Sequence, residues 1–100
     1  MVAITVEFGG GMETLFGGAK TLKTDVPPPS EGAQVTARDV IVWCRDRLVV
    51  DRPELFAKGD TIRPGILVLI NDADWELDGD LESVIENGDR ITFISTLHGG

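Results

Sequence analysis

Alternating apolar and polar residues indicate a strand at each end of the chain. In segment 2–8 large apolar residues alternate with polar or small ones, which is the period-two pattern of a half-buried strand. Segment 90–97 alternates in a similar way. Segment 66–70 is apolar without interruption, which is typical of a strand that is central in a sheet or faces a partner.

Glycines and prolines divide the first third of the chain. Gly9, Gly10 and Gly11 end the first strand and favour a turn, because glycine readily adopts positive φ. A second strand is expected somewhere between residues 14 and 26, with a bulge or turn inside it at residues 17–18. The two strands should form a hairpin, and the proline-rich segment that follows should be an extended loop.

The middle of the chain carries the best helix signal. Thr36 can cap the N-terminus of a helix, and Asp39 suits the positive end of the helix dipole. Pro53 should end the helical pattern near residue 51. A short turn at residues 53–56 should then place an apolar side chain under the core. The predicted buried stripe of the helix is Ala37, Val40, Ile41, Cys44 and Leu48.

These elements together predict the fold. A short edge strand is expected at residues 75–77, and residues 81–85 indicate a turn of 3₁₀ or α helix. A right-handed crossover would place the helix across one face of a mixed sheet. We therefore predict an α+β protein with a β-grasp arrangement, a mixed sheet of about five strands and one main helix. Residues 1–97 should form the domain and residues 98–100 a flexible C-terminal tail.

Composition narrows the class of protein. The chain has 100 residues, which is one domain, and 42% of them are apolar. Its longest apolar run is too short for a membrane helix, and the first residues lack the basic leader of a signal peptide. A single cysteine cannot form an internal disulfide. We expect a monomer in a reducing compartment, without membrane association: the cytoplasm, with the nucleus left open.

Charge points away from nucleic acid. Nine basic and 17 acidic residues give a net charge of −8, so direct binding to a phosphate backbone is not expected. Segment 71–89 holds many carboxylates and no Lys or Arg, which fits either a solvated acidic surface or an electrostatic guide for a basic partner. The segment from Asp74 resembles the opening of a calcium loop, but Ile85 stands where that loop needs its bidentate Glu. We therefore expect no metal site.

The sequence contains no convincing catalytic set. Cys44 lies on the apolar helical stripe, where cysteine behaves as a small core residue. Trp43 and Trp75 are expected to be packing residues. Segment 18–21 resembles the end of a phosphate-binding loop but lacks its glycines. A small protein of this kind acts through what it presents to partners.

What this chain presents is its C-terminus. The last strand runs into His98, Gly99 and Gly100, and glycines can pass through a tunnel too narrow for other residues. The terminal carboxylate is ionised at neutral pH and can attack the α-phosphate of ATP inside an activating enzyme, which gives an acyl adenylate. The alternative is a frayed terminus that ends in two glycines by coincidence.

Several long segments of the sequence resemble one known family. Segments 63–77 and 93–100, supported by segments 6–11 and 52–56, resemble the ubiquitin-related modifier family. The similarity covers nearly the whole chain and is weakest in segment 27–34.

The resemblance implies a ubiquitin-like sulfur carrier that is also a protein modifier. In that family an ATP-dependent activating enzyme adenylates the terminal glycine, and a rhodanese-type persulfide converts it to a thiocarboxylate. A tRNA thiolation enzyme complex passes the sulfur to the wobble uridine, and the same terminus is attached to lysines of target proteins. On this chain the reactive group is the Gly100 carboxylate, presented by Gly99 and His98. The chain itself would be no enzyme and would bind no cofactor, since the activating enzyme uses the ATP.

The strand pattern also predicts a partner-binding surface. Ile91 and Phe93 should face the core, so the other face of the last strand points outward with aliphatic residues of the neighbouring strand. A noncovalent ubiquitin-like binding module remains an alternative, whereas the single cysteine argues against a β-grasp ferredoxin or enzyme. The predicted surface consists of Thr92, Ile94, Thr96, Leu67 and Leu69, with Val68 in the other register. The sequence leaves open whether Lys20, Lys23 and Lys58 are themselves modified.

Overall fold

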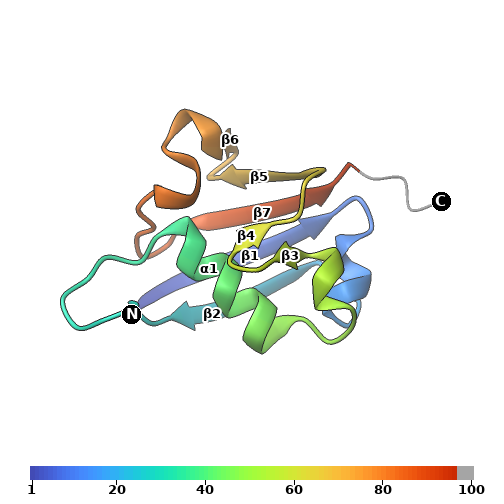
Figure 1. Ribbon diagram of the computed structural model, residues 1–100, viewed down its shortest axis with the longest axis horizontal. Helices are drawn as coiled ribbons and strands as arrows, with labels where there is room; N and C mark the ends of the chain where they lie inside the picture. Colours follow the sequence, from blue (N-terminus) through green and yellow to red (C-terminus); the bar gives the residue numbers. More distant parts are fainter. Residues whose placement is uncertain (97–100) are drawn as a thin grey trace.

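The chain folds into a five-stranded mixed sheet with one main helix across a single face (Figure 1). The computed structural model describes residues 1–96. The strand order is β2-β1-β7-β5-β6, which confirms the predicted β-grasp arrangement. The strands of this sheet are β1 (Val2–Gly9), β2 (Thr21–Val26), β5 (Ile66–Ile70), β6 (Ala73–Asp74) and β7 (Arg90–Ser95).

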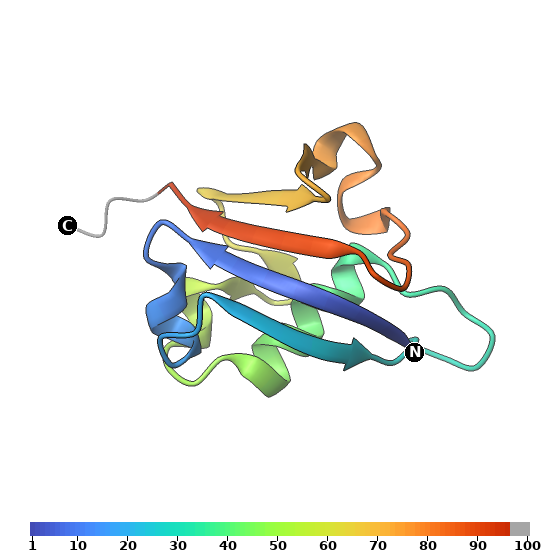
Figure 2. The same ribbon diagram turned by 180° about the vertical axis from the view of Figure 1, so that it is seen from behind.

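Strand β7 is the centre of the sheet. It pairs with β1 in parallel and with β5 antiparallel, whereas β1 and β2 form the expected antiparallel hairpin. Figure 2 shows the face of the sheet that the main helix does not cover. Two segments from opposite ends of the sequence therefore lie side by side in the middle of the protein.

The helix α1 (Ala37–Trp43) begins where the capping signal predicts. The Asp39 carboxylate accepts hydrogen bonds from the Thr36 N–H at 2.8 Å and from the Thr36 hydroxyl at 3.2 Å. The helix continues as a wider π-turn, η2 (Cys44–Leu48), and ends before residue 51. It ends early because the Val50 N–H donates to the Leu15 carbonyl at 2.8 Å rather than to the helix.

The core lies between α1 and the sheet. Val40, Ile41 and Cys44 on the predicted helical stripe are buried, as are Ile91 and Phe93 of β7. Phenylalanine rings fill one end of this core. Among them Phe56 follows the short helix η3 (Pro53–Leu55) and is fully buried, which confirms the predicted turn under the core. Its ring meets that of Phe93 edge to face, with 5.0 Å between the ring centroids.

Two local predictions are corrected. The edge strand expected at residues 75–77 is instead the 3₁₀ helix η4 (Trp75–Leu77), because the chain turns there to bury Trp75. The edge strand is the preceding β6. The second strand begins only at Thr21, since Met12–Phe16 form the 3₁₀ helix η1 with three buried apolar side chains.

Further short elements complete the fold. A two-stranded ribbon of β3 (Ala57–Lys58) and β4 (Thr61–Ile62) was not predicted. The 3₁₀ helix η5 (Asp80–Glu82) lies within the turn expected at residues 81–85. Within residues 1–96, none of the helices is long and apolar enough to cross a membrane.

Candidate functional site

Three segments meet at the end of the sheet where β7 terminates. Ile94 of β7 pairs with Gly9 at the end of β1, and Ser95 pairs with Ile66 at the start of β5. Both neighbours therefore flank the last residues of the strand (Figures 1 and 2). The predicted reactive residues Gly100, Gly99 and His98 lie outside the described residues, as does the predicted boundary between domain and tail.

The outward face of β7 and β5 carries the predicted aliphatic residues. Leu67 lies opposite Ile94 in the strand register, and Leu69 lies opposite Thr92. Leu67 is 37% exposed, whereas Val68 is 1% exposed and faces the core. The sequence left two registers open, and the structure has the one in which Leu67 and Leu69 point outward.

The remaining members of the predicted surface differ in burial. Ile94 and Thr92 are half-buried, and Thr96 is exposed at the end of the strand. A methyl group built on Gly9 would meet the Ile94 side chain at 3.5 Å, so Ile94 packs over this glycine. The side chains are arranged as predicted, and their role in binding partners stays a prediction.

A polar network borders the aliphatic residues. The Thr92 hydroxyl donates to the Glu7 carboxylate at 3.2 Å, and the Arg90 guanidinium lies 3.0 Å from the same carboxylate. Arg90 also pairs with Asp72, and that hydrogen bond raises the pKa of the arginine. The face thus has an aliphatic part toward the end of β7 and a charged part toward its beginning, a division that the sequence did not reveal.

The acidic segment 71–89 lies beyond β5, over β6, η4 and η5 (Figure 1). Some of its carboxylates bind the rest of the protein: Glu82 pairs with Arg38 at 2.9 Å, which raises the pKa of that arginine. Asp74 instead accepts a hydrogen bond from the Glu76 N–H at 3.0 Å and caps η4. Within residues 1–96, no group of three or more His, Cys, Asp and Glu side chains is placed to hold a metal ion.

Cys44 and the tryptophans are packing residues, as predicted. Cys44 is fully buried, and burial raises the pKa of its thiol, so the reactive thiolate is disfavoured. Trp75 is 7% exposed. The Trp43 indole N–H donates to the Thr24 hydroxyl at 2.8 Å, and the Arg47 guanidinium lies 5.1 Å from the centre of its ring.

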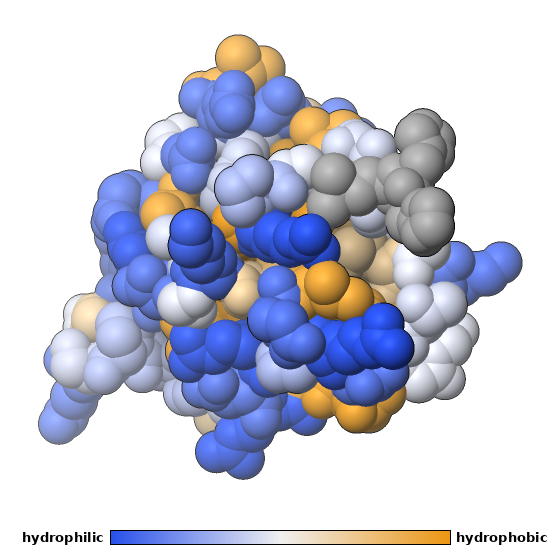
Figure 3. Space-filling view, turned by 45° about the vertical axis from the view of Figure 1, so that its right-hand side comes forward, coloured by the Kyte–Doolittle hydropathy of each residue, from blue (hydrophilic) through white to orange (hydrophobic). Residues whose placement is uncertain are grey.

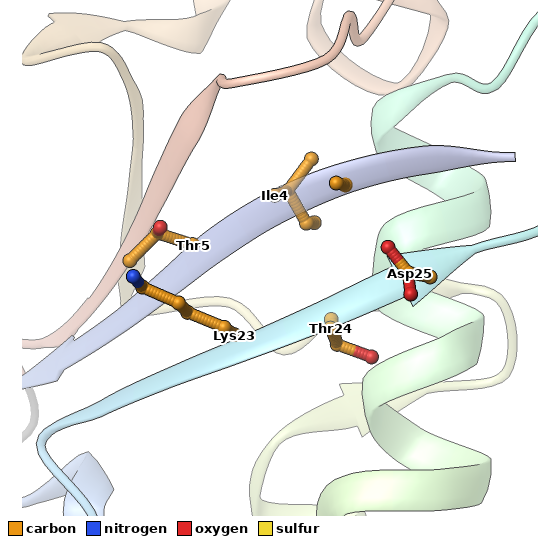
Figure 4. Close-up of a pocket in the computed structure, with 6 residues that line it drawn as sticks. Ile4, Thr5, Lys23, Thr24 and Asp25 are labelled. Carbon is orange, nitrogen blue, oxygen red and sulfur yellow. The ribbon is translucent and has the colours of Figure 1, made fainter.

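Two of the surface pockets that lie among the described residues hold no catalytic set. One pocket of about 280 Å³ lies on the β1–β2 hairpin, where Thr5 and Lys23 are cross-strand neighbours (Figure 4). Another of about 340 Å³ lies between the proline loop and the side of α1. Neither pocket is lined by histidine or cysteine. Lys20, Lys23 and Lys58 are all exposed.

Hydropathy on the surface does not single out one binding site. Figure 3 views the end of the sheet where β1 and β7 terminate, and hydrophilic residues predominate there with small separate hydrophobic patches. Leu67, at 37% exposure, is one of the few large apolar side chains in the described chain that are classed as exposed. Small separate apolar patches are normal on the surface of a folded protein, so the case for a partner-binding face depends on the strand register and not on hydropathy.

A five-stranded mixed sheet with one helix, and a central last strand beside an outward aliphatic face, define a ubiquitin-like β-grasp protein. The family described as Urm1 (ubiquitin related modifier) matches residues 3–100, and the chain belongs to this family. It is a ubiquitin-related modifier by sequence and by fold.

Individual relatives cover the whole chain. A ubiquitin-related modifier 1 homolog from Chlamydomonas reinhardtii is 58% identical over 100 residues, which is 100% of both chains. The human ubiquitin-related modifier 1 is 50% identical over 99 residues, with 99% of this chain and 96% of the human protein covered. The solution structure of Urm1 from Trypanosoma brucei superposes with a TM-score of 0.79 at 40% identity, covering 98% of this chain and 95% of that one.

Proposed function

We propose that this protein is a sulfur carrier and protein modifier whose reactive group is the Gly100 carboxylate. In the first step a carboxylate oxygen attacks the α-phosphorus of ATP and displaces pyrophosphate, which leaves an acyl adenylate. A rhodanese-type persulfide then attacks the acyl carbon and displaces AMP. A second thiol cleaves the resulting acyl disulfide and releases the thiocarboxylate.

The observation that carries this proposal is the family match, because it runs through to Gly100 and includes the paired glycines. The position of β7 supports it. The strand is paired with β1 up to Ile94 and with β5 up to Ser95, so the chain after it starts from a fixed point on the body. A protein that presents its terminus to another active site needs such a fixed starting point.

The proposal places the catalytic groups on the partner. Cys44, the single thiol of the chain, is buried and kept protonated, so it is unsuited to carry the sulfur. The activating enzyme supplies the ATP site and the persulfide, and no cofactor binds to the chain itself. We place the protein in the cytoplasm, with the nucleus left open, and expect it to act as a monomer.

Membership of the family suggests two acceptors for the activated terminus. A tRNA thiolation enzyme complex would take the sulfur for the wobble uridine, and lysines of target proteins would take the acyl group. The net charge of −8 supports delivery through a protein complex rather than direct contact with tRNA.

Intact-mass spectrometry tests the proposal. The protein is incubated with its activating enzyme, Mg-ATP and a persulfide donor. We expect a mass increase equal to the exchange of one oxygen for one sulfur. A noncovalent ubiquitin-like binding module would bind partners through the Leu67 face and show no mass change, which would refute the carrier function.

Deletion of Gly100 provides the matched control. It moves the reactive carboxylate by about 3.5 Å along the chain. Misplacement of even about 1 Å can reduce a reaction rate on the order of a hundredfold, so adenylation should nearly stop while the circular dichroism spectrum stays unchanged. A normal adenylation rate in the deletion variant would show that Gly100 is not the reacting residue.

A further inference from the structure

The peptide group between Ser95 and Thr96 is the last point at which the described chain is attached to the sheet. On one side its N–H, which belongs to Thr96, donates to the Gly65 carbonyl at 2.9 Å. The Thr96 hydroxyl donates to the same carbonyl. This side belongs to the turn that leads into β5.

The other side of the same peptide group faces the turn after β1. Gly10 of this turn has a φ of +65°, in the left-handed region. A Cβ built on Gly10 would overlap the Ser95 carbonyl oxygen and would lie 3.1 Å from both the carbonyl carbon and the nitrogen of Ser95. The turn closes onto the end of β7 only because residue 10 has no side chain.

Planarity couples these two contacts. The carbonyl of Ser95 and the N–H of Thr96 belong to one rigid plane, so neither can rotate without the other. A side chain at residue 10 would push the carbonyl away and turn the N–H from the Gly65 carbonyl. The orientation of this plane sets the direction in which the following residues leave the sheet.

We propose that Gly10 is a positioning residue, which fixes the direction in which the chain leaves β7 and so places the reactive carboxylate of Gly100. This inference rests on the proposed function, because the direction matters only if a partner must receive the terminus. Gly10 would act through the Ser95–Thr96 peptide group and would touch neither ATP nor the acyl adenylate.

The neighbouring glycine offers a matched control. Gly11 has a φ of +94°, so Gly11→Ala strains the backbone at least as much as Gly10→Ala does, but a Cβ on Gly11 meets nothing within 4 Å. Gly10→Asn separates strain from contact in another way, since Asn tolerates the left-handed region yet still adds a Cβ. If strain were the cause, Gly11→Ala would be impaired and Gly10→Asn would be rescued.

Two readouts follow the orientation and the reaction separately. Amide hydrogen exchange by NMR reports whether the Thr96 N–H keeps its hydrogen bond. Steady-state adenylation with the activating enzyme, followed by pyrophosphate release, reports kcat and KM. For Gly10→Ala and Gly10→Asn we expect loss of Thr96 protection and a fall in kcat of about tenfold or more, with KM within about twofold. Gly11→Ala should match the wild type in both readouts.

Thr96→Pro tests the same peptide group from the other side and does not depend on the folding of the Gly10 variants. It removes the N–H that donates to Gly65, and because Thr96 is exposed and follows the last residue of β7, the ladder hydrogen bonds of the sheet stay in place. We expect the same fall in kcat.

The outcomes separate the two ideas. Normal kcat in the folded Gly10 variants, or in Thr96→Pro if the former do not fold, would overturn the role of Gly10. Rescue by Gly10→Asn would overturn it as well. If the wild-type protein itself forms no adenylate, the proposed function fails, and Thr96 exchange alone decides whether Gly10 orients the chain.

Discussion

Replacing Leu67 with aspartate should weaken binding to the activating enzyme while leaving the fold intact. Leu67 is the better position for this test than Ile94, because Ile94 is half-buried over Gly9 and its replacement would also disturb the sheet. Leu67 is 37% exposed and lies opposite Ile94 on the outward face, at the end of the sheet where β7 terminates.

The exposed fraction sets the expected magnitude. Full burial of a leucine side chain stabilises by about 1.5–3 kcal/mol. The exposed 37% of Leu67 can therefore contribute about 0.6–1.1 kcal/mol when a partner covers it. Leu67→Ala should lose no more than this. Leu67→Asp adds the cost of burying a polar group, about 1–3 kcal/mol, so its binding should weaken by at least about tenfold.

Calorimetric titration of the activating enzyme without ATP measures this loss. Val84→Asp is the matched control, because Val84 is 39% exposed and the variant carries the same added charge. Val84 lines a pocket with Met1 and Val2, so it lies by the start of β1, at the far end of the sheet from the end of β7. If folded Leu67→Asp binds as tightly as Val84→Asp, the outward aliphatic face is not the interface.

Three further outcomes are expected. Burial raises the pKa of the Cys44 thiol, so above about pH 8.5 only the unfolded state loses this proton and the free energy of unfolding should fall by up to about 1.4 kcal/mol per pH unit. Urea denaturation at several pH values measures this slope, which Cys44→Ala should lack. Association with the activating enzyme should slow as salt rises from about 0.05 to 0.5 M, whereas a salt-independent rate would make segment 71–89 only a solvated face. Asp39→Ala removes the carboxylate that caps α1 and should cost about 1 kcal/mol, read from its denaturation midpoint, and an unchanged midpoint would contradict the capping role.

The sequence predicts the sheet well where burial alone decides the structure. In β1 and β7 one face packs against α1, so the alternation of apolar residues reports both the strand and its orientation. The prediction that Ile91 and Phe93 are buried depends on this alternation, and it is confirmed. In β5 both faces are apolar, so the sequence gives the strand but not its register.

The sequence fails where tertiary contacts override a local pattern. Trp75 belongs to an apolar–polar alternation that suits a strand. The chain instead forms the 3₁₀ helix η4, because this turn buries the Trp75 side chain in the core. The late start of β2 has the same cause, since η1 buries Leu15 and Phe16. The role of Gly10 could not be found this way at all. A glycine run indicates a turn, but the contact that excludes a side chain is made by Ser95, far along the chain.

We expect the position of the terminal carboxylate to be better defined after a central strand than after an edge strand. An edge strand has one hydrogen-bonded neighbour and frays at its end, whereas β7 is paired with β1 and β5 up to its last residues. The position of the terminal carboxylate then depends on two quantities, the number of residues after the strand and the direction in which they leave it. Deletion of Gly100 changes the first, and a side chain at Gly10 changes the second. Because Thr96→Pro changes the second quantity without a side chain at Gly10, kinetics with the activating enzyme can separate the two.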